Sequence, residues 1–258
     1  YALCSQIRLH GGNPDTDLIE LAPRDGEHLL RTEDVLRAIE DAGEELATVM
    51  IGGVNYYTGQ LHDMKAITAA AHEAGATCGF DLAHAMGNVH LDLHNWGVDF
   101  ACWCSYKYLN SGPGAVSGVF IHERHVRQAD GTGTAMRRLE GWWGHDAESR
   151  FNMDPDFVPM PSAEAWQMSN APVLNMAVHK VSLDLFQEAG MEALVARSKR
   201  LTACLETLVH IVAERTGTHL EILTPTDSQA RGCQLSVVAH GSVSYTHLRA
   251  HETPEHLV

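Results

Sequence analysis

Apolar positions recur at helical spacing in two early stretches of the chain, residues 32–46 and residues 64–74. Thr32 and Asp63 stand at their starts, where a side-chain oxygen can accept a hydrogen bond from a free backbone N–H. Short apolar runs bounded by glycine or polar residues predict buried strands over 47–51, 77–80, 98–105 and 115–121. Strands and helices that alternate with short connections predict an α/β fold with a mainly parallel sheet flanked by helices.

The second half of the chain has a different pattern. Residues 124–160 are rich in glycine and proline and predict loops. Two long helices are predicted over 173–189 and 191–215, and two short strands over 220–223 and 234–239.

These patterns suggest two domains and a tail. We expect an incomplete large domain over residues 1–172 and the start of a smaller α+β domain over residues 173–241. Residues 242–258 carry three histidines without usable periodicity, and we expect this tail to be foreign to the fold or disordered. Ordinary divergence at a C-terminus is the alternative.

Composition narrows the class of protein. Lys and Arg total 18 against 33 Asp and Glu among 258 residues, a net charge of −15, which argues against a nucleic-acid partner. No apolar run is long enough to predict a membrane span. Six cysteines without a disulfide pattern indicate reduced, buried thiols and a cytoplasmic location, and Cys102 and Cys104 would face the same side of a strand.

Lys107 is the most unusual of the four lysines. It follows an apolar run and precedes a glycine-rich turn, whereas Lys65, Lys180 and Lys199 fall in predicted helices. Partial desolvation at the end of a strand disfavours the ammonium form, which is what a lysine that bonds covalently to a carbonyl compound requires. A lysine that merely flanks a tight turn is the simpler interpretation of this residue alone.

Asp81 ends the neighbouring predicted strand, and His84 follows it by three residues. A buried carboxylate needs a cationic partner, and the protonated ring nitrogen of pyridoxal phosphate would provide one. Ligands of open α/β sheets bind at the carboxyl ends of the strands, where both Asp81 and Lys107 are predicted. The alternative is that Asp81 caps the next turn.

The residues around this pair resemble kynureninase, a pyridoxal-phosphate enzyme of the aspartate aminotransferase fold (fold type I). The longest similar runs are 79–85 (GFDLAHA) and 96–110 (WGVDFACWCSYKYLN). Three shorter runs follow the same pattern in the expected order: 57–60 (YTGQ), 141–145 (GWWGH) and 169–172 (SNAP). The resemblance extends from about residue 1 to residue 239.

The resemblance implies roles for individual residues. Lys107 would bind pyridoxal phosphate covalently, Asp81 would pair with the ring nitrogen, and His84 would lie beside the ring. Tyr106 would hydrogen-bond the phosphate and donate a proton. The implied reaction is hydrolysis of L-kynurenine, and of 3-hydroxykynurenine, to anthranilate or 3-hydroxyanthranilate and L-alanine, within tryptophan degradation and NAD biosynthesis.

Three further residues gain a role only from the resemblance. Trp142 and Asn170 match positions that contact the cofactor phosphate, partly from a neighbouring subunit, and a homodimer is implied. His145 matches a position near the small-molecule substrate. Without the resemblance, Trp142 would be interpreted as a packing residue and His145 as a loop histidine.

Members of this family are longer at both ends. The first residue is Tyr1, and the upstream phosphate-binding segment and the downstream arginine for the substrate carboxylate have no counterpart here. We therefore expect a fragment that binds the cofactor weakly and turns over little.

Other functions remain open on the sequence alone. A metal-dependent hydrolase could use His90, Asp92 and His94, although no metal is our expectation. A cysteine desulfurase or an aminotransferase would use the same Asp81 and Lys107 pair, and an inactive binding module is conceivable for a fragment. A dinucleotide-binding fold is disfavoured, because no GxGxxG follows a strand.

Overall fold

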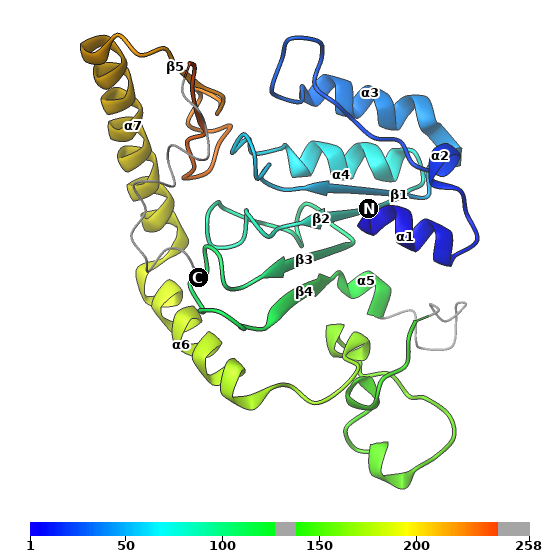
Figure 1. Cartoon of the computed structure of the whole chain (residues 1–258). Helices are drawn as coiled ribbons and strands as arrows, with labels where there is room; N and C mark the ends of the chain where they lie inside the picture. The colour runs from blue at the N-terminus through cyan, green and yellow to red at the C-terminus, as the bar shows by residue number, and fades with distance from the viewer. Residues whose placement is uncertain (127–137, 242–258) are drawn as a thin grey trace.

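A computed structural model describes residues 1–126 and 138–241 of the chain (Figure 1). Its main sheet has four strands in the order β1 (Thr48–Gly52), β2 (Thr77–Asp81), β3 (Phe100–Cys104) and β4 (Ser117–Ile121). The first three are parallel, as the alternation of strands and helices predicted. This arrangement confirms the α/β prediction. The tail of residues 242–258 lies outside the described residues.

Strand β4 runs antiparallel to β3, so the sheet is mixed rather than wholly parallel. A parallel neighbour needs a crossover connection that is usually an α-helix. The link between these strands, residues 105–116, consists of turns and bends instead. The chain therefore folds straight back along β3.

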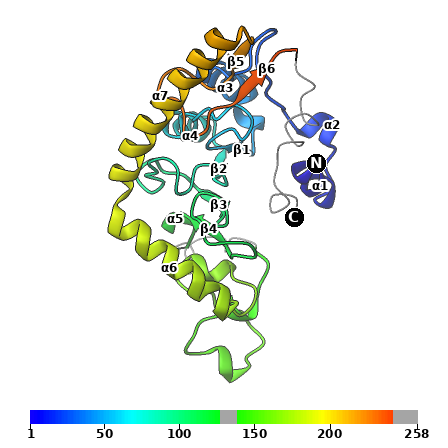
Figure 2. The same ribbon diagram turned by 60° about the vertical axis from the view of Figure 1, so that its left-hand side comes forward.

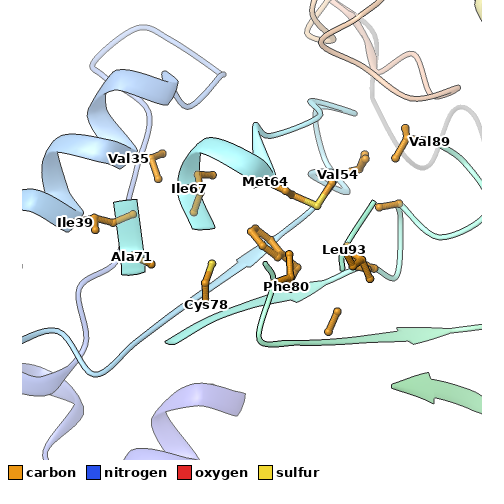
Figure 3. Packing of buried hydrophobic residues seen from close by; sticks show 14 of the residues in the cluster. Val35, Ile39, Val54, Met64, Ile67, Ala71, Cys78, Phe80, Val89 and Leu93 are labelled. Carbon is orange, nitrogen blue, oxygen red and sulfur yellow. The ribbon is translucent and has the colours of Figure 1, made fainter. Parts of the chain in front are cut away.

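Two helices cover one face of the sheet. Helix α4 (Met64–Glu73) packs on β2, and α3 (Thr32–Ala42) packs on α4 (Figure 1). The core between them includes the fully buried side chains of Phe80 and Ile67 (Figure 3), each of which stabilises the fold by roughly 1.5–3 kcal/mol.

Of the two predicted helix caps, Asp63 is confirmed and Thr32 is wrong. Asp63 is the N-cap of α4, because its carboxylate accepts a hydrogen bond from Ala66 N at 3.0 Å. Thr32 is not a cap: the backbone is still extended at Arg31, which forms an ion pair with Glu27, and Thr32 is already the first helical residue. Helix α3 also ends earlier than predicted, because Gly43 adopts a positive φ of 51°.

The C-terminal half runs along one side of the sheet. Helices α6 (Val173–Ala189) and α7 (Met191–Thr216) follow one another and part at Gly190, where φ is 74° (Figures 1 and 2). A two-stranded antiparallel sheet of β5 (Leu220–Ile222) and β6 (Val237–Ala239) follows them. The domain boundary near residue 172 falls just before α6 and stays a prediction.

The remaining elements are short. They are α1 (Ala2–Leu9), α2 (Pro14–Asp17), α5 (Glu123–Val126) and the 3-10 turns Gly43–Glu45, Trp142–Gly144, Arg150–Asn152 and Ala163–Trp166. Among the helices of the described ranges, none is long and apolar enough to cross a bilayer.

All six cysteines are free thiols. The expectation that they are buried is wrong for most of them: Cys78 is buried, whereas Cys102 and Cys204 are exposed. Cys102 neighbours the fully buried Ala101, and alternate side chains of a strand point to opposite faces of the sheet. The residue therefore lies on the face that α3 and α4 do not cover.

A buried carboxylate joins the helices to the sheet. Asp99, 3% exposed, accepts hydrogen bonds from Cys78 N at 2.7 Å, His72 Nε2 at 2.8 Å and His125 Nε2 at 2.7 Å. The Arg124 guanidinium lies 3.7 Å away. Burial alone would raise the pKa of Asp99, but these hydrogen bonds outweigh burial and hold the pKa below its ordinary value.

Replacing Asp99 with asparagine is expected to lower the free energy of unfolding at pH 7 by about 2–4 kcal/mol, because a buried charge-assisted network is lost. The folded-state pKa is the lower one, so this stability is present above the unfolded pKa of about 3.9 and disappears as the pH falls through the folded pKa. Urea unfolding at pH 7 and at successively lower pH measures both effects. The exposed change Asp41→Asn is the control. A difference between parent and Asp99→Asn that stays constant down to the lowest pH would contradict this assignment.

Candidate active site

Asp81 lies at the carboxyl end of β2, in the middle of the three parallel strands. It is paired in the sheet with Gly52 of β1 and Cys102 of β3. Its residue is exposed, and its Oδ1 accepts a hydrogen bond from Ala83 N at 2.8 Å. The carboxylate thus caps the following turn, as the alternative interpretation of Asp81 predicted. This contact uses Oδ1 and leaves Oδ2 for another interaction.

His84 and Lys107 meet at this end of the sheet. Lys107, half-buried, follows β3, and its Nζ lies 3.0 Å from Nε2 of His84, which the turn after β2 carries. Burial lowers the pKa of His84, the Lys107 amine lowers it further, and the Asp81 carboxylate opposes both. A neutral imidazole therefore faces the lysine amine, with a carboxylate close enough to act on it.

The second nitrogen of His84 has no hydrogen-bond partner among the residues that the structure describes. This atom, Nδ1, is buried. A buried polar atom left without a partner costs free energy, and such atoms in native proteins commonly mark a functional role. This atom marks the surroundings of His84 as a place where a further polar group can bind.

Two tyrosine rings border His84, and the sequence did not single them out. The Tyr108 ring centroid lies 5.9 Å from that of His84 in an edge arrangement, and the Tyr56 ring lies at 6.3 Å. Burial raises the pKa of Tyr108, and the Cys233 thiol raises it further. The position of Tyr108 directly after Lys107 was the available signal, whereas Tyr56 reaches the site from a distant loop.

Tyr106 is exposed beside the lysine. A hydrogen bond with the Cys104 thiol raises the pKa of its phenol above the ordinary value. The hydroxyl therefore keeps its proton at neutral pH and can donate it. Cys102 and Cys104 occupy alternate positions of β3, so both thiols share the face that carries this site.

Trp142, His145 and Asn170 lie in a different part of the molecule. Within the described residues, no hydrogen bond or ring contact joins them to Asp81, His84 or Lys107. Figure 1 shows their segment beyond the β4 edge of the sheet. The Trp142 ring packs against Phe151 at 5.6 Å and the His145 ring against Phe157 at 5.6 Å.

The backbones that carry Trp142 and Asn170 nevertheless approach each other closely. A Cβ added to Gly141 would lie 2.2 Å from Cα of Met168, so only glycine fits there. The chain segments next to Trp142 and Asn170 therefore lie side by side, apart from the lysine.

The histidines proposed for a metal lie differently from a helical ligand pair. The stretch that holds His90 and His94 forms turns rather than a helix. His94 stacks on His122 with ring centroids 4.8 Å apart, and its Nε2 is 3.5 Å from Glu123. In the part of the chain that the structure describes, no group of three or more His, Cys, Asp or Glu side chains is arranged to hold a metal ion.

Comparison with known sequences places this arrangement in a wider context. A family model described as aminotransferase class-V matches residues 16–241. Kynureninase from Flavobacterium psychrophilum is 50% identical over 241 residues, which are 93% of this chain and 56% of that protein. Kynureninase from Myxococcus xanthus is 52% identical over 93% of this chain and 55% of its own length. The chain therefore spans slightly more than half the length of the curated relatives it matches.

Solved structures share the fold at low sequence identity. An alanine–glyoxylate aminotransferase from Nostoc matches with a TM-score of 0.64 and 20% identity, over 93% of this chain and 57% of that one. An apo cysteine desulfurase from Thermococcus onnurineus matches with a TM-score of 0.63 and 14% identity, over 86% of this chain and 50% of that one.

Proposed function

The chain belongs to the aminotransferase class-V family, and we propose that its protein is a kynureninase that uses pyridoxal phosphate. The reaction is L-kynurenine plus water to anthranilate plus L-alanine, and 3-hydroxykynurenine is a second substrate. One observation carries the proposal: the Lys107 amine lies 3.0 Å from Nε2 of a neutral His84. Asp81 lies beside them, and the three residues meet where the parallel strands β2 and β3 end. The choice of substrate rests on kynureninases that are 50–52% identical over 93% of this chain.

The residues present suit pyridoxal phosphate. The cofactor offers an aldehyde, a basic ring nitrogen and a phosphate, and these match an amine, a carboxylate and hydroxyl donors. The orphaned Nδ1 of His84 is a buried polar atom for which such a ligand supplies a partner. Lys107, Asp81, His84 and Tyr106 would hold the cofactor in one protomer.

The bound cofactor supplies an electron-withdrawing ring that stabilises negative charge at the substrate Cα. The chain's own groups manage the protons. Lys107 Nζ takes and returns the proton at the substrate Cα, and neutral His84 accepts a hydrogen bond from that amine. Asp81 would pair with the ring nitrogen of the cofactor, and its negative charge would favour the protonated form of that nitrogen. Tyr106 holds a proton at its phenol oxygen for donation.

The remaining site residues are assigned to a homodimer. Trp142 and Asn170 would contact the cofactor phosphate, partly from the neighbouring subunit, and His145 would lie near the substrate. Their segment lies outside the β4 edge in Figure 1, where a second copy could meet it, and the apolar side chains of Leu174 and Val181 on α6 are exposed. A dimer in sedimentation experiments would agree with this assignment, whereas a monomer at micromolar concentration would not.

The free thiols fit a cytoplasmic location.

Two measurements test the proposal. Borohydride reduction of the chain after loading with pyridoxal phosphate, followed by peptide mapping, is expected to place one pyridoxyl group on Lys107 and none on Lys65, Lys180 or Lys199. The full-length product of the gene is then supplied with kynurenine, cysteine or alanine and glyoxylate in turn. Equal amounts of anthranilate and alanine from kynurenine support the assignment. Sulfide from cysteine, or amino transfer to glyoxylate, would replace it with another activity of the same family.

A further inference from the structure

Residues 230–236, which precede β6, lie across the loop that follows β1. The Ala230 carbonyl accepts a hydrogen bond from Leu61 N at 2.9 Å, and the Gln234 side chain donates to the carbonyl of Tyr56 at 2.9 Å. We call residues 230–236 the strap. These bonds hold the strap against the end of the sheet where Lys107 lies.

One buried side chain connects the strap to the site. Asn88, 7% exposed, accepts a hydrogen bond from Cys233 N at Oδ1, at 2.9 Å. Its Nδ2 donates to the carbonyl of His84, also at 2.9 Å. The approach is close enough that a Cβ added to Gly232 would lie 2.4 Å from Nδ2 of Asn88.

We propose that Asn88 is a positioning residue, whose amide ties the His84 turn to the strap and thereby sets the contact between His84 and Lys107. The connection is continuous: Cys233 N to Asn88, Asn88 to the His84 carbonyl, and His84 Nε2 to Lys107 Nζ at 3.0 Å. The role of this connection in catalysis rests on the proposed function. The connection is observed independently of that proposal.

A side-chain amide suits this position for a chemical reason. The Cys233 N–H needs an acceptor and the His84 carbonyl needs a donor, and an asparagine side chain supplies both from one planar group. Removing it would leave two backbone groups without partners in a largely buried place, and the turn would relax to reach water. The same turn carries His84, so its ring would move away from the lysine.

A second contact runs in parallel. The Tyr108 hydroxyl interacts with the Cys233 thiol, while the Tyr108 ring borders His84. The strap thus reaches the residues beside Lys107 by two routes, and the amide route runs through two hydrogen bonds to backbone groups. This second route predicts a partial loss on removal of Asn88 rather than a complete one.

The test measures the reactivity of Lys107 in the chain without cofactor. Acetic anhydride labels lysine amines, and mass spectrometry compares Lys107 with exposed Lys65 in the same sample. In Asn88→Ala, the Lys107 rate relative to Lys65 is expected to rise by about threefold or more, because the amine is no longer held in its hydrogen bond with His84 Nε2. The matched control is Asn95→Ala, an exposed asparagine that bonds only to Asp92 among the described contacts.

A second variant approaches the same contact from the strap. Gly232→Ala places a methyl group against Asn88 and is expected to raise the relative rate in the same direction, with no added effect when both changes are combined. Asn88→Asp keeps the acceptor for Cys233 N but sets an oxygen against the His84 carbonyl, so it is also expected to raise the rate.

Circular dichroism establishes that each variant is folded, and any that is not is left out of the comparison. Unchanged relative rates in the folded variants would overturn the positioning role, because a purely structural contact would alter stability and leave the lysine as reactive as before. The readout involves neither kynurenine nor pyridoxal phosphate. Failure of the hydrolysis assay would therefore leave this result standing, and the reverse also holds.

Discussion

Replacing Lys107 with alanine is expected to abolish covalent retention of pyridoxal phosphate and to lower kcat/KM for kynurenine by about a thousandfold or more. In the proposed mechanism the amine is both the attachment point and the group that moves the Cα proton, so one change removes two functions. The other three lysines lie on helices. Lys65 is on α4, Lys180 is paired with Asp184 on α6, and Lys199 on α7 binds the Gln229 side chain at 2.7 Å.

Two variants separate chemistry from structure at this position. Lys107→Arg keeps a positive charge beside His84, but its guanidinium stays protonated and cannot attack an aldehyde, so we expect the same loss as with alanine. Lys180→Ala changes an exposed helical lysine and is expected to retain cofactor fully. Borohydride fixation with peptide mapping, together with anthranilate release by the full-length protein, gives both readouts. A pyridoxyl group at another lysine would show that Lys107 is not the attachment point.

The part of the site that local sequence pattern predicts is the part built from strand ends. Asp81 and Lys107 each follow an apolar run, and apolar runs joined by a crossover connection place their carboxyl ends at one edge of a parallel sheet. The structure puts the two strands side by side and adds a hydrogen bond between His84 and Lys107, which the three-residue spacing from Asp81 only suggested.

Long-range contacts escaped prediction for a physical reason. Asn88 and Cys233 are 145 residues apart, and nothing in the apolar pattern around either residue indicates their hydrogen bond. The direction of β4 depends on whether a crossover helix forms, and a short apolar run looks the same in either direction. Trp142 lies away from Lys107 in a loop-rich segment, and periodicity along the chain does not encode where such a segment packs.

Replacing Asp81 with asparagine is expected to lower kcat for kynurenine by about a hundredfold or more while changing cofactor affinity far less. The asparagine amide has nearly the shape of the carboxylate, and its oxygen can still accept the hydrogen bond from Ala83 N, so the turn that carries His84 should persist. What disappears is the negative charge that, in the proposed mechanism, favours a protonated ring nitrogen. The loss then falls on the chemical step, because the ring can no longer stabilise charge at the substrate Cα.

His84 provides a second readout of this change that needs no cofactor. The Asp81 carboxylate raises the pKa of His84 against the opposing effects of burial and Lys107, so its removal should lower that pKa further. Histidine resonances followed by NMR across pH 5–8 can measure this shift, because histidine titrates in that range. Asp81→Glu retains the charge and is expected to recover part of kcat. If Asp81→Asn retained full kcat while the His84 pKa fell as expected, the carboxylate would lie beside the imidazole without acting on the ring, and its role in the reaction would have to be given up.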